Sequence, residues 1–124
     1  SNDLHFKPLD YSGTTSTGAC VRYSSVTSGY ITFTFNNVFN NGKWHHYACS
    51  YSSVNGFRVY KDGVLYATST AVTGTMDTTA DPICFGGDCD GTPIRFWTGS
   101  LDDIRFYNRV LSDAEVKLLY DLTR

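Results

Sequence analysis

The stretch Trp97–Tyr120, WTGSLDDIRFYNRVLSDAEVKLLY, decides the fold of this chain. Its first half predicts a strand over residues 101–107, because apolar and polar side chains alternate there. In such a strand Asp102 would share a face with Ile104 and Phe106. A carboxylate on an apolar face is costly unless it is hydrogen-bonded, paired or bound to a metal. Asp102 is therefore the residue of this strand that most needs a partner.

The second half of the stretch predicts a short helix. Ser112 and Glu115 are spaced as a capping box, in which each side chain bonds the backbone amide of the other residue. Leu111 and Val116 occupy the staple positions on either side. Hydrophobic residues then recur at helical spacing at Val116, Leu119 and Tyr120. The helix should therefore press one apolar stripe onto the rest of the domain.

Composition places the chain among small all-β domains. Its 124 residues suffice for one domain, and aromatic residues make up 15%. The formal net charge is -2 and no Lys/Arg cluster occurs, so nucleic acid and anionic membranes are poor partners. No apolar run approaches the roughly 20 residues that a membrane span requires, which argues against membrane insertion. The chain does not begin with Met, so we expect either a removed presequence or an excised domain.

The cysteines indicate disulfides and an oxidising, extracellular compartment. The chain has an even number of them without paired C-x-x-C motifs, which disfavours zinc. Three pairings are possible in principle. Loop size and strand order favour Cys84 with Cys89, a local bridge, and Cys20 with Cys49.

Turn residues divide the rest of the chain into short strands. We expect an edge strand within residues 1–8 and further strands over residues 19–25 and 30–35. Three dipeptides that can take positive φ then predict type I′ hairpins, with strands adjacent in the chain also adjacent in a sheet. These dipeptides are Asn41–Gly42, Asn55–Gly56 and Asp62–Gly63.

The C-terminal stretch closely resembles the end of a laminin G-like domain of the concanavalin A-like jelly-roll superfamily. Residues 42–51 are similar to the family's Trp-x-His strand, and residues 59–65 to its Tyr-x-Asp-Gly hairpin. The resemblance covers about residues 29–122 and implies an antiparallel β-sandwich with one short C-terminal helix, formed as a single domain by residues 1–124. The short N-terminal strands raise the expectation that another copy covers an exposed edge.

Glycan hydrolysis, which relatives in this superfamily perform, is not expected here. It requires two carboxyl groups that flank one glycosidic bond. The chain has a single Glu, Glu115, which the capping box uses. Asp102 and Asp103 are consecutive in the predicted strand and point to opposite faces. His45 and His46 are also consecutive, so only one can face any given site. We therefore predict that the protein is not an enzyme.

Calcium is the one cofactor that the sequence suggests. Asp102 could hold Ca²⁺ together with another Asp and backbone carbonyls, since calcium prefers oxygen ligands. Many laminin G-like relatives bind calcium, some of them at this position. The alternative is that Asp102 bonds buried amides or pairs with His46 or an Arg. The Asp88–Gly91 loop is a second candidate, although it lacks the downstream Glu of an EF-hand.

Sugar binding is the function that we favour from the sequence. An aromatic ring packs on the apolar face of a pyranose, while Asp, Asn and Arg bond its hydroxyls. The candidate residues form one loop cluster and a second group near a turn: Asp88, Asp90, Arg95 and Trp97, then Tyr51 and Asn55. Each has a structural alternative, since aromatic residues also build cores and Asp–Gly pairs make turns. Trp44 is expected in the core from its family position.

We therefore expect a secreted lectin that binds glycans or glycoproteins, with galactose-type ligands such as N-acetyllactosamine preferred. Because a single sugar site is weak, a dimer or tetramer with two-fold interfaces is expected. The alternative is an extracellular adhesion or scaffold module that binds another protein and belongs to a larger chain.

Overall fold

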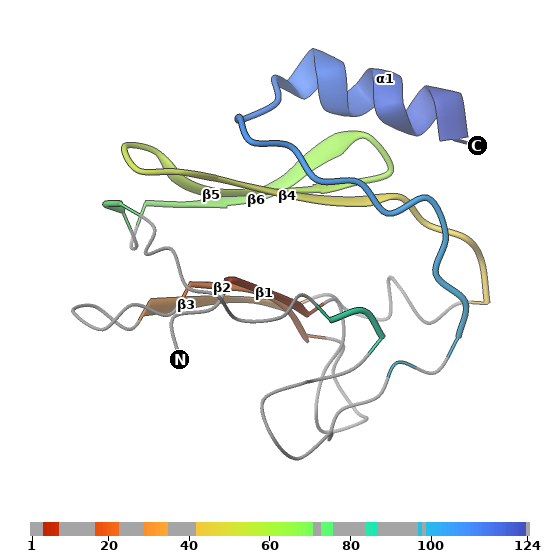
Figure 1. The fold of residues 1–124 in the computed structure, drawn as a ribbon, viewed down its shortest axis with the longest axis horizontal. Helices are drawn as coiled ribbons and strands as arrows, with labels where there is room; N and C mark the ends of the chain where they lie inside the picture. Colours follow the sequence, from red (N-terminus) through yellow and green to blue (C-terminus); the bar gives the residue numbers. More distant parts are fainter. Residues whose placement is uncertain are drawn as a thin grey trace.

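A computed structural model describes the backbone of residues 4–7, 17–22 and 29–34, and residues 42–70, 73–75, 84–86, 97 and 99–123 with their side chains (Figure 1). Two antiparallel three-stranded sheets lie in layers, and a helix lies on the outer face of the second sheet (Figure 1). The elements in chain order are β1 (Leu4–Lys7), β2 (Thr17–Arg22), β3 (Gly29–Thr34), β4 (Tyr47–Ser52), β5 (Gly56–Lys61), β6 (Val64–Ser69) and α1 (Asp113–Thr123). The predicted all-β class with one C-terminal helix is confirmed.

Each sheet follows chain order, which gives the sequence β1-β2-β3 in one and β4-β5-β6 in the other. The predicted N-terminal strand is present as β1, at an edge of the first sheet. In the second sheet, β5 is central and pairs with β4 from Tyr47↔Lys61 to Ser52↔Gly56. A bulge at Val59/Tyr60 shifts its register against β6.

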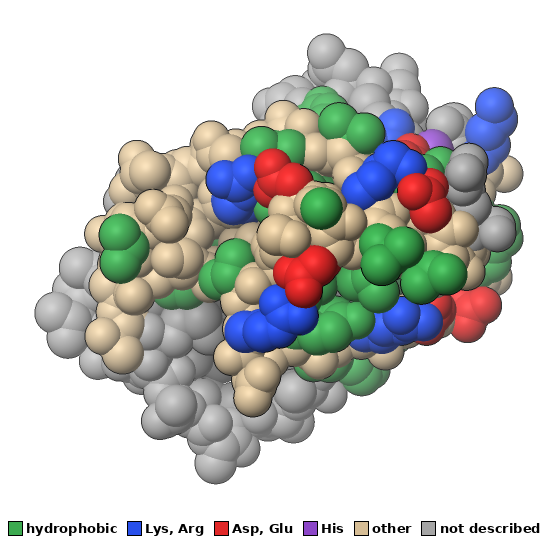
Figure 2. Space-filling view, turned by 90° about the horizontal axis from the view of Figure 1, so that it is seen from above, with side chains coloured by type: hydrophobic (Ala, Val, Ile, Leu, Met, Phe, Trp, Pro, Cys, Tyr) green, Lys and Arg blue, Asp and Glu red, His purple; other side chains and the backbone are tan. Residues whose placement is uncertain are grey.

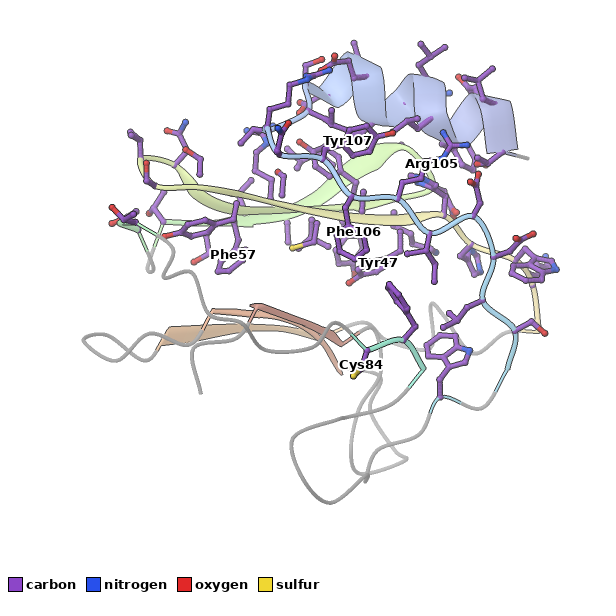
Figure 3. All side chains as sticks on the ribbon, viewed as in Figure 1. Tyr47, Phe57, Cys84, Arg105, Phe106 and Tyr107 are labelled. Carbon is purple, nitrogen blue, oxygen red and sulfur yellow. The ribbon has the colours of Figure 1, made fainter. Side chains whose placement is uncertain are left out.

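The central strand β5 supplies most of the buried core that the structure describes. Phe57, Val59 and Tyr60 are 0% exposed, and Val116 of α1 is 1% exposed. Alternation explains why one strand is buried on both faces. Phe57 points toward the first sheet, with its ring centroid 4.8 Å from that of Tyr51 (Figure 3). Tyr60 points toward α1, where its hydroxyl donates to Asp113 at 2.9 Å.

The turn chemistry is confirmed at one dipeptide and differs at two. Asp62 and Gly63 have φ of 50° and 76°, as a type I′ turn between β5 and β6 requires. At the β4–β5 turn only Gly56 takes a positive φ, 67°, while Asn55 does not. The strands pair there as predicted, but through a longer turn that closes at Ser52↔Gly56.

The third dipeptide does not join neighbouring strands, so this prediction was wrong. β3 and β4 belong to different sheets, and the chain around Gly42 crosses from one layer to the other (Figure 1). Gly42 does adopt positive φ, 74°. The dipeptide therefore reports a local change of chain direction, and that change does not specify which sheet the next strand enters.

The predicted strand over residues 101–107 was also wrong, because these residues carry no strand. Asp103 has φ of 52°, which interrupts extended backbone, and Asp102 Oδ1 accepts the Asp103 amide at 2.8 Å. Past this kink the alternation persists. Phe106 points to the same side of the second sheet as Tyr47, whereas Arg105 and Tyr107 point to the side of α1 (Figure 3).

The helix confirms its prediction in detail. Glu115 N donates to Ser112 Oγ at 3.2 Å, and Ser112 N donates to Glu115 Oε2 at 2.8 Å, which is the capping box. Val116 is buried, and Leu119 and Tyr120 are half-buried on the same stripe. On the outer face of α1, acidic and basic side chains lie next to one another around hydrophobic ones (Figure 2).

Candidate functional site

The predicted site residues fall partly outside the described residues. Asp88, Asp90 and Arg95 lie there, as does Cys89. Trp97, Tyr51, Asn55 and Asp102 are described. The loop cluster predicted around Trp97 therefore remains a prediction.

Trp97 is half-buried and lies between two loops. Its amide donates to the Gly86 carbonyl at 2.8 Å, and its indole Nε1 lies 2.9 Å from where a Cβ on Gly99 would stand. Because Gly99 has no side chain, the indole can approach its backbone. Its φ of 146° also favours glycine at this position. Among the described residues Nε1 has no hydrogen-bond partner. These contacts indicate a packing role for much of the ring.

Tyr51 and Asn55 lie at the β4–β5 end of the second sheet. The Tyr51 hydroxyl donates to the Gly74 carbonyl at 2.6 Å, and its ring packs on Phe57. Asn55 is exposed in the turn, and its amide donates to Ser52 Oγ at 3.2 Å. Tyr51 thus connects a loop to the sheet, while Asn55 remains accessible to a ligand.

Cys49 and Cys84 each take part in a disulfide. Cys89 and the side chain of Cys20 are outside the described residues, so the pairing expected from loop size stays a prediction. No described cysteine is free.

Asp102 is exposed rather than directed at an apolar face, so the burial cost expected for it does not arise. The hydrogen bond to the Asp103 amide occupies its Oδ1. Among the described residues there is no group of three or more His, Cys, Asp or Glu side chains placed to hold a metal ion. The calcium site expected at Asp102, with another Asp and backbone carbonyls, stays a prediction.

Trp44 contradicts its prediction, because it is 70% exposed rather than in the core. Strand β4 begins only at Tyr47, so the alternation that would direct the indole inward has not started at Trp44. Sequence reasoning missed this residue as a surface feature. The signal in the sequence was that Trp44 directly precedes His45 and His46. The β5–β6 turn holds these two residues through Asp62.

The Asp62 carboxylate fixes the backbone that carries Trp44. Its Oδ1 accepts the His46 amide at 3.1 Å, and its Oδ2 pairs with His45 Nδ1 at 2.9 Å. In return the Asp62 amide donates to the His46 carbonyl at 2.9 Å. Lys61 Nζ lies 3.8 Å from Oδ2. We call Trp44, His45 and Asp62 the Trp44 corner.

His46 links this corner to the segment that precedes α1. Burial lowers the pKa of His46, and the negative charges of Asp62 and Asp103 oppose that shift. The positive charge of Arg105 also acts on it, in the same direction as burial. Both Asp103 and Arg105 therefore lie within electrostatic range of the β4 entry. The His46 ring lies 6.0 Å from that of Tyr120 in α1, measured between centroids.

Asp103 and Arg105 form an exposed bidentate ion pair. Arg105 Nε donates to Asp103 Oδ1 at 2.9 Å, and its Nη2 donates to Oδ2 at 2.9 Å. The hydrogen bond to Asp103 is the largest cause that raises the pKa of Arg105, and a hydrogen bond to Tyr107 is the second. Such a planar pair keeps free acceptor lone pairs and donor hydrogens toward solvent, where a diol could bind.

Glu115 is held by more contacts than the capping box alone. Arg109 donates to it twice, from Nη2 to Oε1 at 2.7 Å and from Nη1 to Oε2 at 3.0 Å. These bonds, followed by that from the Ser112 amide, lower the pKa of Glu115 to about 2. The carboxylate is therefore ionised at neutral pH.

The comparisons with known proteins agree with this architecture. A laminin G-type family model, described as the concanavalin A-like lectin/glucanases superfamily, matches residues 5–117. A crystal structure of an S-layer domain-containing protein (residues 221–444) from Clostridium thermocellum is similar with a TM-score of 0.57 and 18% identity, over 97% of this chain. The chain spans 65% of that solved chain, and the likeness shows the fold alone.

No curated protein matches the chain. Within the described part of the chain, no helix combines the length and the apolar character needed to span a lipid bilayer.

Proposed function

The chain belongs to the concanavalin A-like lectin/glucanases superfamily, and on that premise we propose that it is an extracellular carbohydrate-binding domain that holds a glycan without cleaving it. The superfamily contains both binding proteins and hydrolases, so the choice between them must come from this chain's own carboxyl groups. Glu115 is the observation that carries the choice.

Retaining and inverting glycosidases need one carboxylic acid that gives a proton and a second carboxylate nearby. Glu115 is the chain's single Glu. With both oxygens bonded to Arg109 and a pKa of about 2, it has no proton to give at neutral pH. Asp103 is likewise paired, in its case with Arg105. Among the described residues these interactions favour binding over hydrolysis.

The ligand that we propose is a neutral glycan, with galactose-type sugars such as N-acetyllactosamine tested first. The predicted loop residues Asp88, Asp90, Arg95 and Trp97 remain candidates for contact, and exposed Asn55 is a further one. Calcium remains a proposal of the same kind. Asp102 would contribute one carboxylate, and another Asp and backbone carbonyls would complete the ligand set.

A glycan array tests this function directly. Purified protein is applied with calcium and again after EDTA treatment, and the bound glycans are then incubated with the protein and analysed for cleavage. We expect binding to a limited set of neutral glycans and no new reducing ends. A flat array under both conditions contradicts the function, and released oligosaccharides contradict the non-catalytic part. Loss of binding after EDTA would support the calcium proposal, and its persistence would overturn it.

A second candidate function is an adhesion module that binds another protein. Exposed apolar side chains on α1 favour it, namely Leu118 and Leu122, which lie one helical turn apart. Neighbouring exposed apolar groups are typical of interaction surfaces. A flat glycan array combined with a precursor that carries flanking domains would favour this function over the lectin.

We also propose that the domain works as a dimer or tetramer, because linked weak sites gain avidity. Within the described part of the second sheet, β6 is an edge strand, and residues 64–69 carry no charge. Uncharged edges are open to pairing with another strand. Light scattering after size exclusion measures the mass, and a monomer at high concentration would contradict the proposal.

A further inference from the structure

We propose that the Trp44 corner is the sugar-contact site of this domain, and that it takes an uncharged pyranose stacked on the Trp44 indole. This inference rests on the proposed function and gives it a location. That location differs from the loop cluster and the β4–β5 turn favoured by the sequence.

The first observation is the exposure of Trp44. The Trp44 indole is 70% exposed, so a large apolar ring lies in water. Burying that ring against an apolar surface would be favourable. A pyranose ring offers the complementary surface, because its axial C–H groups form an apolar patch the size of an aromatic face. The indole is also rigid, with only two side-chain torsions to immobilise on binding.

The second observation is that the backbone beneath the indole is held from several directions. Asp62 makes three short contacts to His45 and His46, with distances of 2.9, 3.1 and 2.9 Å. The turn that carries Asp62 lies directly under α1, since a Cβ on Gly63 would stand 3.0 Å from Tyr120 Cβ. An indole on a fixed backbone loses little conformational entropy when a ligand binds. The binding free energy from stacking one ring is small, and little of it is then lost to ordering the site.

The third observation concerns the polar groups of the turn that holds His45. The Asp62 side chain is 30% exposed, and the His45 side chain that bonds it at 2.9 Å is 13% exposed. Lys61 Nζ lies 3.8 Å from Asp62 Oδ2. A carboxylate acceptor beside an ammonium donor can bond neighbouring hydroxyls of a sugar.

The experiment measures binding of biotinylated N-acetyllactosamine and of neutral glycans found on the array, by biolayer interferometry. The variants are Trp44→Ala and Trp44→Tyr, with Val54→Ala as the matched control. Val54 is 76% exposed in the opposite turn of the sheet. We expect Trp44→Ala to weaken binding about tenfold or more, Trp44→Tyr to keep it within a few-fold, and Val54→Ala to leave it unchanged.

The results distinguish a wrong location of the sugar site from a wrong function of the protein. Wild-type binding that Trp44→Ala does not reduce overturns the corner and leaves the carbohydrate function intact. A wild-type protein that binds no glycan overturns both. Binding that weakens equally in Trp44→Ala and Val54→Ala also overturns the corner, because the effect is then not specific to the indole. Circular dichroism confirms that the variants are folded, as expected for substitutions at exposed positions.

Discussion

Gly63→Ala is the substitution whose effect the structure defines most sharply. Gly63 has φ of 76° and lies under α1, so an added methyl group meets two separate penalties. Left-handed backbone costs an L-residue about 1–2 kcal/mol, offset by about 0.4–1 kcal/mol from the stiffer unfolded chain. The methyl group would also stand 2.9 Å from Lys117 Cδ and 3.0 Å from Tyr120 Cβ. The Lys117 chain can move, but Tyr120 Cβ moves only with the helix.

Gly42→Ala is the matched control for this substitution. Its φ of 74° is almost the same, and nothing lies within 4 Å of the added methyl group. It should therefore lower the free energy of unfolding by about 1 kcal/mol, from backbone strain alone. Gly63→Ala should lower it by about 2–4 kcal/mol, because overpacking adds about 1–3 kcal/mol.

Urea unfolding followed by tyrosine and tryptophan fluorescence measures both free energies. Hydrogen exchange of the α1 amides gives a second measurement, and it should accelerate in Gly63→Ala but not in Gly42→Ala. Equal destabilisation by the two substitutions, with unchanged exchange in α1, would refute the close contact between the helix and the β5–β6 turn.

Three further predictions concern the groups that hold α1 and the β4 entry. Tyr60→Phe removes a hydroxyl that bonds both Arg58 and Asp113 at 2.9 Å. It should lower the free energy of unfolding by about 1–2 kcal/mol. An unchanged midpoint in urea unfolding would contradict this prediction. Burial lowers the pKa of His46 from 6.5, so the unfolded chain binds protons more readily and stability should fall as the pH drops below 6.5. His46→Gln should flatten that slope below pH 6.5, and an unchanged slope would assign the proton uptake to another group. The pKa of Glu115 is lowered from 4.5 to about 2. Its contribution to stability is therefore present above pH 4.5 and lost as the pH falls toward 2. Glu115→Gln should lack this acid-dependent loss of stability in pH-jump unfolding.

The parts of the fold that sequence reasoning predicted correctly are those set by neighbours in the chain. The capping box needs only Ser112 and Glu115 three residues apart, and it appears as predicted. The turn at Asp62–Gly63 needs only two residues that tolerate positive φ. In both cases the stabilising contacts lie within a few residues, so the local pattern contains the information that decides the structure.

Two of the errors arise where distant contacts decide the outcome. The pattern around Asn41–Gly42 indicates a turn, but it does not specify that β4 enters the other sheet. Over residues 101–107 the cause is local. Alternation predicts a strand, whereas Asp103 takes a left-handed conformation, with its amide bonded to Asp102 and its carboxylate paired with Arg105. Trp44 was expected in the core from its family position, but it is 70% exposed, and Asp62, distant in sequence, bonds the His45 side chain and the His46 amide next to it.

The same contrast explains why the family resemblance identifies the fold without identifying the ligand. The C-terminal part of the motif is used in closing and docking α1, since Arg109, Ser112 and Glu115 bond to one another. Side chains committed in this way have little capacity left to recognise a sugar. A sugar would then be recognised by residues that these contacts leave accessible to solvent. In the described part of this chain, Trp44 is an accessible aromatic residue, 70% exposed beside the turn in which Asp62 bonds His45 and His46.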